Sequence, residues 1–493
     1  MVLSSINPND IRAVDIDINA IHSYKANLEH DGVNLYFGSI NNFLFDIITD
    51  RRRHLPTKGD VDFILAGSPC QGFSIANTRG HDNQKSLSNS ALVCTTISAI
   101  DFYRPKYALL ENVPAMASSR KYQNGNAIIS NQIMCALIGM GYQCRCLFLD
   151  AWNFGAPQLR TRLFIEIAAP GCVLPEIPPG SHAHPSGMTK RAIGKTATNI
   201  KFAERDVDTL TSFPPVQVGD VWDGLPNIGN GHLGVCIPYP DHKPYWTANA
   251  RDRHLAAHIP HSDSLVPAKD SRFPGYRWAL RRNLIPRHLQ PRVIPENEMD
   301  MRFIRIAADG LIPTVTTAQN PLDRNVGKTL HYNQDRVLSN LEAKRAQGFL
   351  DTDVLVGKAV KAYRIIGNSV CRQVAFALGE SLAEAVRKTP KVERSKEMEL
   401  VGGVLKGHID HGVATAQSPP QTRQFMVLIM KKGVKRNFAG FNGNCNNRDP
   451  ITAADVRVDL AVSGGVERLE VSVASSQRKK IRIAVDAEFE DAL

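Results

Sequence analysis

The sequence predicts an open α/β fold with a mainly parallel sheet that helices cover on both faces. Two observations support this fold class. Short apolar runs alternate with longer stretches of helical apolar spacing over the first 170 residues, and the runs read as buried strands. Alternation of strand and helix is typical of parallel strands joined by crossover helices.

The predicted elements follow one another in a regular order. Two helices separate the strands and have apolar residues at intervals of three and four. The strands are Val61–Ala66, Tyr107–Leu110, Gln143–Leu149 and Leu163–Ala168, and the helices are Ala91–Tyr103 and Asn131–Met140.

The rest of the chain divides by composition. Residues 1–170 form the first part of the α/β domain, and residues 171–304, rich in Pro, Gly, His and Arg, form an irregular second domain. Order returns over 305–390, where a Gly-Asn-Ser turn opens a long amphipathic helix. A charged linker and a small β-rich extension occupy 391–493, with runs at Phe425–Met430, Val456–Val462, Leu469–Ala474 and Ile481–Val485.

Bulk properties narrow the class of protein. No run of eighteen apolar residues is present, and the N-terminus lacks the pattern of a secretory signal, so we expect an intracellular protein without a membrane span. The nine cysteines show no metal-binding spacing, which predicts no metal site. The net charge of +11 favours a polyanionic partner, above all nucleic acid.

Two short segments carry the chemistry. Gly67-Ser68-Pro69-Cys70-Gln71-Gly72-Phe73-Ser74 comes directly after one predicted strand, and Glu111-Asn112-Val113 directly after another. Ligands of open α/β sheets bind beyond the carboxyl ends of the strands, so neighbouring parallel strands would bring Cys70 and Glu111 to one edge. An isolated Pro-Cys pair would more simply be a buried turn. The full octapeptide, together with Glu111 after a neighbouring strand, favours an active site.

A thiol and a carboxyl side by side suit the methylation of cytosine at C5. That carbon is a poor nucleophile until a thiolate adds at C6 and pushes electron density onto it. A carboxyl in a pocket of low dielectric can stabilise the charge that builds at N3. We therefore predict Cys70 as the nucleophile and Glu111 as its acid partner.

At this point the sequence resembles the cytosine-C5 DNA methyltransferases. The two segments above look like the family's catalytic loop and acid motif, and three further motifs follow in the family's order across residues 12–390. These are Gln158-Leu159-Arg160-Thr161-Arg162, the run Glu342, Arg345, Gln347, Gly348 and Phe349, and Gly367-Asn368-Ser369-Val370.

The resemblance implies a Rossmann-like fold that uses S-adenosyl-L-methionine, with an inserted target-recognition domain over 171–304. It also assigns roles to single residues. Arg160 and Arg162 would hold the flipped cytosine and the catalytic loop. The residues implied to bind the cofactor are Asp15, Ile16, Pro69, Leu92, Asn368 and Ser369, and those implied to bind double-stranded DNA are Gln71, Ser74, Arg277, Arg281 and Arg282.

Within the family, the sequence resembles the fungal repeat-induced-point-mutation-defective and Masc-type group. The segments that carry this likeness are DAWNFGAPQLRTRLFIEIAAPG, PPGSHAHPSG and HYNQDRVLSNLEAKRAQGF. It implies a nuclear protein in epigenetic silencing of repeats, with chromatin or silencing factors as partners.

The sequence also departs from the family. A strand ending in a glycine-rich cofactor loop is expected before Arg12 and is not seen, and Ser39 stands where the family has an acid. Three explanations compete for this missing strand. In the first, upstream residues were lost in gene prediction, and in the second, the protein is a degenerate paralogue. In the third, the C-terminus supplies the strand, with 458–469 as the first suspect. We expect poor binding of S-adenosylmethionine by this chain.

Two other functions stay open from the sequence. A paralogue that has lost catalysis would act as a DNA- or chromatin-binding silencing factor. The tRNA-directed branch of the family is disfavoured, because its Cys-Phe-Thr signature is not visible.

Overall fold

The computed structural model describes most of residues 11–390 and four short C-terminal strands. The described residues are 11–27, 34–49, 55–69, 84–122, 125–185, 188, 194–195, 199, 201–202, 205, 210–229, 239–243, 250–261, 275–290, 302–323, 326–390, 425–429, 456–463, 466–473 and 481–483. The chain divides into two compact units, Met1–Gly433 and Val434–Leu493.

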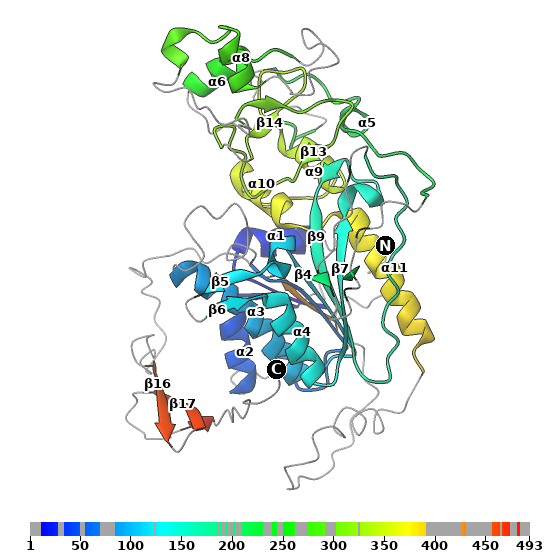
Figure 1. Cartoon of the computed structure of the whole chain (residues 1–493), viewed down its shortest axis with the longest axis vertical. Coiled ribbons are helices and arrows are strands. Elements are labelled where there is room, and N and C mark those ends of the chain that lie inside the picture. The colour runs from blue at the N-terminus through cyan, green and yellow to red at the C-terminus, as the bar shows by residue number, and fades with distance from the viewer. Residues whose placement is uncertain are drawn as a thin grey trace. The chain divides into compact units, whose positions relative to one another are not determined.

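A seven-stranded sheet forms the centre of the first unit (Figure 1). Its strands, in spatial order, are β2 (Asn34–Phe37), β1 (Ile11–Asp15), β15 (Phe425–Ile429), β3 (Phe63–Gly67), β4 (Tyr107–Asn112), β9 (Thr161–Ala168) and β7 (Gln143–Asp150). The first five are parallel, and β9 runs antiparallel to both β4 and β7. The predicted mainly parallel α/β sheet is confirmed.

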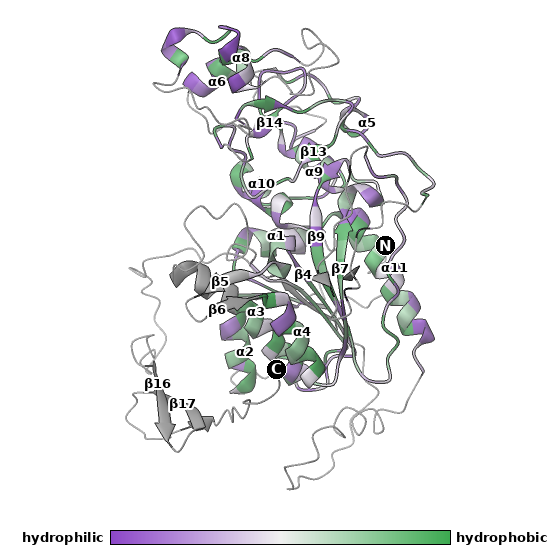
Figure 2. Cartoon of the chain, viewed as in Figure 1, coloured by the Kyte–Doolittle hydropathy of each residue, from purple (hydrophilic) through white to green (hydrophobic). Residues whose placement is uncertain are grey.

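Helices cover the sheet on both faces, as the alternation of elements predicted. On one face lie α2 (Ile40–Ile48), α3 (Gln84–Tyr103) and α4 (Ile129–Gly139), and on the other lies α11 (Arg372–Lys388). Figure 2 shows polar and apolar residues together on α2 and α4, as expected of helices that bury one side.

The alternation of side chains along each strand explains the two cores. In β3, Ile64 packs into the core beneath α2 to α4, whereas its neighbour Phe63 packs with Ala385 of α11. In β9, Ile165 and Phe164 divide between the two faces in the same way. Strands apolar on both faces are characteristic of a sheet covered on both sides.

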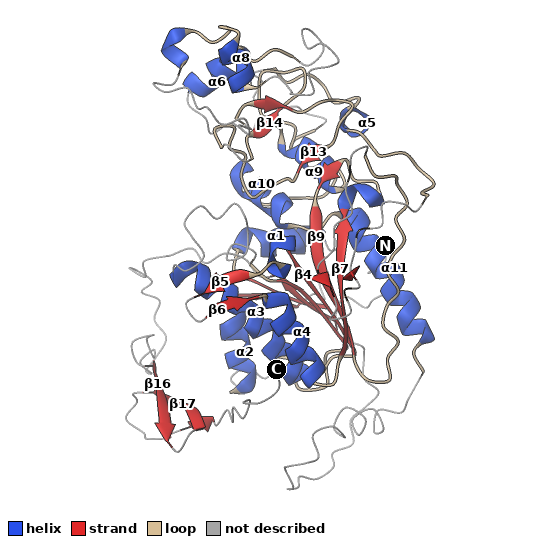
Figure 3. Cartoon of the chain, in the orientation of Figure 1, coloured by secondary structure: helices blue, strands red, loops and turns tan. Residues whose placement is uncertain are grey.

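A second core joins the irregular region to the closing part of the α/β domain. It contains Trp222, Leu255 and Leu280 from the region before residue 305, and Val315 and Ile366 after it. Figure 3 shows that loops make up most of this region. Its helices are α5 (Val218–Trp222), α6 (Ala250–Ala257), α8 (Tyr276–Arg281), α9 (Asn340–Gln347) and α10 (Ala359–Asn368).

Short elements complete the first unit. Helix α1 (Ile18–Asn27) follows β1, and the 3-10 helices are η4 (Pro114–Ala117), η5 (Ala151–Phe154) and η6 (Arg287–Leu289). The remaining strands are β5 (Arg120–Tyr122), β6 (Gly125–Ala127), β8 (Gln158–Leu159), β10 (Gly194–Lys195), β11 (Lys201–Phe202), β12 (Ile304–Arg305), β13 (Ile312–Pro313) and β14 (Lys328–Leu330).

The Gly-Asn-Ser turn lies between two helices. Helix α11 follows it as predicted, but α10 precedes it and ends at Asn368, which the sequence analysis did not predict. A Cβ atom on Gly367 would lie 1.9 Å from the carbonyl oxygen of Thr316. Only glycine permits this close approach of two backbones.

The predicted β-rich extension is split by the structure. β16 (Val456–Ser463), β17 (Val466–Val473) and β18 (Ile481–Ile483) form an antiparallel sheet in the second unit, in which Ser463 pairs with Val466. Residues 458–469 therefore lie in this hairpin and do not supply the strand missing from the large sheet. The run at 425–429 does not belong to the antiparallel sheet. It forms β15 in the centre of the large sheet, because a run without charges suits a strand covered on both faces.

A buried ion pair anchors the start of α9. Both nitrogens Nη1 and Nη2 of Arg336 donate to the Glu342 carboxylate, at 2.8 and 2.6 Å, and each residue is 1% exposed. The same carboxylate accepts the backbone N–H of Ser339, whose hydroxyl accepts the N–H of Glu342 in turn. Burial would raise the pKa of Glu342, but Arg336 and these hydrogen bonds lower it to about 2.

We predict that Glu342→Gln lowers the free energy of unfolding by about 3–5 kcal/mol near pH 7, because it leaves Arg336 buried without a counter-charge. The carboxylate's folded pKa lies below its unfolded value, so its contribution is present above pH 5 and is lost as the pH falls toward 2. Urea unfolding across this pH range measures both effects.

Glu384→Gln is the matched control, since Glu384 makes an exposed ion pair with Arg387. It should leave unfolding nearly unchanged. An equal loss in both variants would contradict a special role for the buried pair.

Candidate active site

The backbone register places the predicted site residues in one row across the sheet. Asp15 pairs with Phe37 of β2, and Gly67 pairs with both Ile429 of β15 and Glu111 of β4. Val14 pairs with Leu428 one position earlier, so Asp15 and Ile429 share this row. Three strand spacings separate Asp15 from Glu111, about 14 Å. The row marks the carboxyl edge of the parallel strands, where ligands bind in such sheets.

Glu111 makes an ion pair with Arg162. The Nε atom of Arg162 on β9 lies 3.0 Å from Oε1 of Glu111, and the two side chains are 15% and 17% exposed. The antiparallel pairing of β9 with β4 brings the arginine alongside the acid. The contact fixes the direction of the carboxylate and leaves part of it open to a ligand.

Asn112 connects the two predicted loops. Its Nδ2 donates to the backbone carbonyl of Ser68 at 3.3 Å, and its Oδ1 accepts the N–H of Val113 at 2.9 Å. The side chain is 4% exposed. The loop after β3 is therefore held directly against the end of β4.

Cys70, the predicted nucleophile, lies outside the described residues, as do Gln71 and Ser74. The chain is described as far as Pro69, which is buried at the end of β3 and directly precedes Cys70. The structure thus places Ser68 and Pro69, the first residues of the loop after β3, relative to Glu111. It does not describe the contacts of the Cys70 thiol.

Arg160 has a different environment from Arg162. It is 2% exposed and donates to the carbonyls of Val315 at 3.0 Å, Gly367 at 3.2 Å and Ser369 at 2.6 Å. These carbonyls belong to the closing part of the domain. The geometry makes Arg160 a positioning residue that joins the two parts of a discontinuous domain.

Gln158 strengthens the same junction. Its amide accepts the N–H of Val315 at 2.8 Å and donates to Oε1 of Gln347 at 2.5 Å. Gln347 in turn donates to the carbonyl of Ser369 at 2.7 Å. The two glutamines are fully buried, so the motifs around residues 160, 347 and 369 form one connected network.

The residues predicted to bind the cofactor have a chemistry that suits a nucleoside joined to an amino acid. The Asp15 carboxylate accepts the backbone N–H of Asp17 at 2.7 Å at the end of β1, where it suits ribose hydroxyls. Ile16 and Phe37 beside it are 37% and 56% exposed, so both offer apolar surface that a flat base could contact. Ser39 caps helix α2 through the N–H of Asn41.

The other predicted cofactor residues lie on two elements. Pro69 is buried at the end of β3 and Leu92 is half-buried on α3. Asn368 and Ser369, both half-buried, lie where α10 ends. The segment before α10 packs on α1, where the N–H of Val356 donates to Ser23 at 2.8 Å. This contact brings the closing part of the domain beside α1, which follows Asp15.

Two of the arginines predicted to contact DNA, Arg277 and Arg281, lie on the short helix α8, and the third, Arg282, caps its C-terminus. Arg277 is half-buried on α8, whereas Arg281 and Arg282 are exposed. The guanidinium of Arg282 lies 3.9 Å from the centre of the Trp278 ring, a cation–π contact that limits its freedom. One of the three predicted arginines is therefore in contact with an aromatic ring of the same segment.

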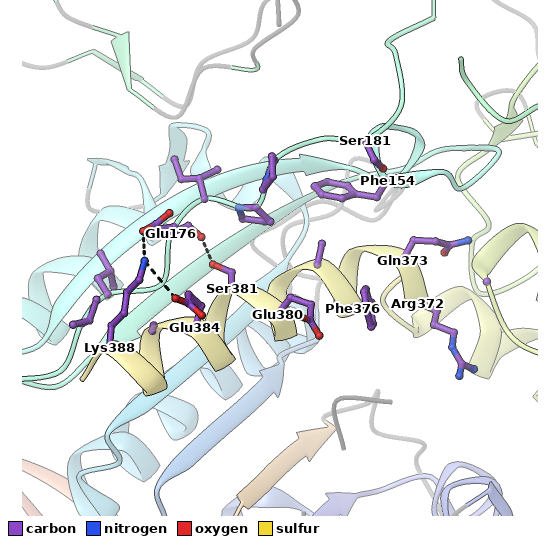
Figure 4. Close-up of a pocket in the computed structure, with 18 residues that line it drawn as sticks. Phe154, Glu176, Ser181, Arg372, Gln373, Phe376, Glu380, Ser381, Glu384 and Lys388 are labelled. Atoms are coloured by element: carbon purple, nitrogen blue, oxygen red, sulfur yellow. Dashed lines mark hydrogen bonds and ion pairs between the residues drawn. The ribbon is translucent and has the colours of Figure 1, made fainter. Parts of the chain in front are cut away.

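A cavity of the first unit lies away from this edge. It measures about 620 Å³ between α11 and the segment after β9, and none of the predicted site residues lines it. Figure 4 shows Lys388 between Glu176 and Glu384 at one end, at 2.9 and 3.7 Å.

Neither a metal centre nor a membrane span is found in the described part of the chain. No three His, Cys, Asp or Glu side chains group there so that they could hold a metal ion. Each described helix is too short or too polar to cross a bilayer.

Comparison with known proteins identifies the family. The model of C-5 cytosine-specific DNA methylases matches residues 2–201 and 271–384, well over half of the chain. DNA (cytosine-5)-methyltransferase 1B of Oryza sativa is 30% identical over 356 residues, 68% of this chain and 23% of that protein. DNA (cytosine-5)-methyltransferase 1 of Mus musculus is 30% identical over 390 residues, 66% of this chain and 24% of that protein.

Solved structures are also similar. A putative DNA modification methyltransferase from an Escherichia coli prophage has a TM-score of 0.42 at 19% identity, covering 76% of this chain and 92% of its own. A DNMT2 mutant of Spodoptera frugiperda has a TM-score of 0.40 at 16% identity, covering 76% and 91%.

The mainly parallel sheet, covered by helices on both faces, agrees with the Rossmann-like fold that the sequence predicted. The chain belongs to the C-5 cytosine-specific DNA methylase family. It spans about a quarter of the length of the relatives named above.

Sequence reasoning missed three residues of the site. Asn112 stood inside a recognised motif, but its bond to the Ser68 carbonyl depends on the neighbouring strand. Gln158 and Gln347 were likewise recognised only as motif members. A polar side chain beside buried strands was the available signal, because such a group must find a partner.

We predict that Gln158→Leu destabilises the protein by about 1–3 kcal/mol, because the N–H of Val315 and the Gln347 amide lose a buried partner. Thermal unfolding measures the effect. The same change at exposed Gln143, which donates to the carbonyl of Cys172, is the control and should cost much less. Equal losses would mean that the junction depends on packing alone.

Proposed function

We propose that this protein transfers a methyl group from S-adenosylmethionine to C5 of cytosine in DNA. The observation that carries the proposal is the junction of β3 and β4, where Gly67 pairs with Glu111 and Asn112 holds the Ser68 carbonyl. It supports a thiol and a carboxyl at one sheet edge, the pair that this reaction requires. Membership of the C-5 cytosine-specific family supports the same substrate.

Cys70 would act as a thiolate that adds to C6 of the cytosine. The electron pair displaced onto C5 then attacks the methyl group, and loss of the C5 proton with expulsion of the Cys70 sulfur restores the aromatic ring. Glu111, in its protonated form, would donate its O–H to N3 as negative charge builds there during the addition. Arg162, 3.0 Å away, would hold the direction of that carboxyl group.

S-adenosylmethionine supplies the electrophilic methyl group when it is bound. Asp15 would hold its ribose hydroxyls and Ile16 would pack on the adenine. Pro69 and Leu92 would line one wall, and Asn368 with Ser369 the other. Exposed apolar side chains beside a carboxylate support this assignment of the edge at β1.

The target base must leave the duplex to reach Cys70, since C6 is inaccessible inside the stack. Gln71 and Ser74 would contact DNA from the catalytic loop, and Arg277, Arg281 and Arg282 from the region before residue 305. The surplus of positive charge supports binding to the phosphate backbone. From the sequence resemblance we further propose nuclear localisation and a role in silencing repeats with chromatin partners.

Covalent trapping tests the nucleophile. On DNA that contains 5-fluorocytosine, the wild type should form a complex that survives denaturation, because fluorine at C5 cannot leave as a cation. Cys70→Ser should form none. Cys94→Ser removes an exposed thiol and is the matched control, which should trap normally. Equal trapping by wild type and Cys70→Ser would exclude Cys70 from the reaction.

A second prediction concerns the acid. Glu111→Gln should keep DNA binding and lower the methylation rate about 10²–10³-fold, since its contribution is made to the transition state. Single-turnover transfer of a labelled methyl group separates binding from chemistry. Glu380→Gln, on the exposed side of α11, should leave both unchanged. A Glu111→Gln variant with lost DNA binding and intact turnover would contradict the proposed role.

A further inference from the structure

A strand from the C-terminal part of the chain occupies the middle of the parallel sheet. Phe425–Ile429 runs parallel to β1, with four paired positions, and parallel to β3, with five. β1 and β3 do not pair with each other. Without this strand they would stand two spacings apart, about 10 Å, with a row of backbone groups facing the gap on each side.

The donated strand comes from far along the chain. Helix α11 ends at Lys388 and β15 begins at Phe425, so 36 residues connect the closing helix to the slot. Parallel strands require connections of a dozen residues or more, and this one is long enough. The segment is therefore joined to α11 by a connection long enough to reach the slot.

The composition of the segment suits this one place. Phe425–Ile429 is FMVLI, with no charge, no proline and no glycine, as a strand buried on both faces requires. The later strands β16 and β17, VRVDLAVS and VERLEVSV, alternate charged and apolar residues and pair with each other instead. The chain thus contains a segment that matches the slot and others that do not.

The strand also sets the geometry of the site. In the row across the carboxyl edge, Ile429 stands between Asp15 and Gly67. The hydrogen-bonded connection between the proposed cofactor acid and the loop that leads to Cys70 passes through β15. Loss of the strand would leave the spacing of these two elements undefined.

We propose that the slot between β1 and β3 is a strand-binding site, that its ligand is the chain's own Phe425–Ile429, and that the cofactor edge forms only while this segment is seated. The part that concerns the cofactor rests on the proposed function. The part that concerns the slot stands without it.

Proline at the middle of the segment tests the slot in the full-length protein. Val427→Pro removes a backbone donor and places a ring within a central strand. Val471→Pro makes the same change in β17, the middle strand of the second sheet, and is the matched control. Hydrogen exchange read by mass spectrometry reports on each strand separately.

Val427→Pro should speed exchange at least tenfold in Ile11–Asp15 and Phe63–Gly67, with little change in β7 and β9. Val471→Pro should leave β1 and β3 protected. A peptide of residues 421–433, added in excess to the Val427→Pro protein, should restore protection, whereas the same peptide with the proline should not. Unchanged exchange of β1 and β3 in Val427→Pro would overturn the proposal.

The wild type gives a test that needs no variant. Residues 425–429 should exchange as slowly as 63–67, and at a rate independent of protein concentration. Rapid exchange of 425–429 in the wild type would overturn the proposal even if Val427→Pro failed to fold. Protection that grows with protein concentration would assign the strand to a second copy of the chain and overturn its intramolecular origin.

Calorimetry with S-adenosylmethionine separates the two parts. The wild type and Val471→Pro should bind alike, and Val427→Pro should bind at least tenfold more weakly. If β1 and β3 are protected from exchange in a wild type that binds no cofactor, the proposed cofactor site is wrong. The proposal that Phe425–Ile429 fills the slot would still hold. Equal cofactor binding by Val427→Pro and wild type would overturn the dependence of the edge on β15.

Discussion

The parallel register of the central sheet is the constraint on which the rest of the structure depends. Because the strands run the same way and stay in step, Asp15, Gly67 and Glu111 end in one row although about 100 residues separate the first from the last. A shift of one residue in any pair would turn one of these side chains toward the opposite face. The arrangement of the site is in this sense a property of the backbone.

The second requirement is a junction between parts of the domain that are distant in sequence. Arg160 and Gln158 provide it with buried hydrogen bonds to the backbone and side chains of 315–369. A charged or amide group is costly to bury without partners, so these bonds favour a single docking geometry. Arg162, near the start of β9, faces the candidate acid instead. Two arginines of one motif thus have different surroundings, because Arg160 lies between β8 and β9 whereas Arg162 lies within β9.

Charge is used differently in the two regions beyond the sheet. Arg336 and Glu342 are buried together and fix the start of α9, whereas Arg281 and Arg282 remain exposed on α8. The former pair can only hold structure, and the latter can meet a polyanion. The basic surplus seen in the composition is therefore partly structural, and a count of charges does not separate the two uses.

The sequence alone predicted the fold class and the strands β3, β4, β7 and β9, because apolar periodicity is a local property. Short motifs, which are also local, gave the candidate residues of the site. It could not show that Asn112 binds the Ser68 carbonyl or that Arg160 joins two halves of the domain, since each bond joins segments 44 or more residues apart. It also placed Phe425–Met430 in the extension. Only the tertiary structure brought that run between β1 and β3, because strand order depends on which edges remain unpaired once the whole chain has packed.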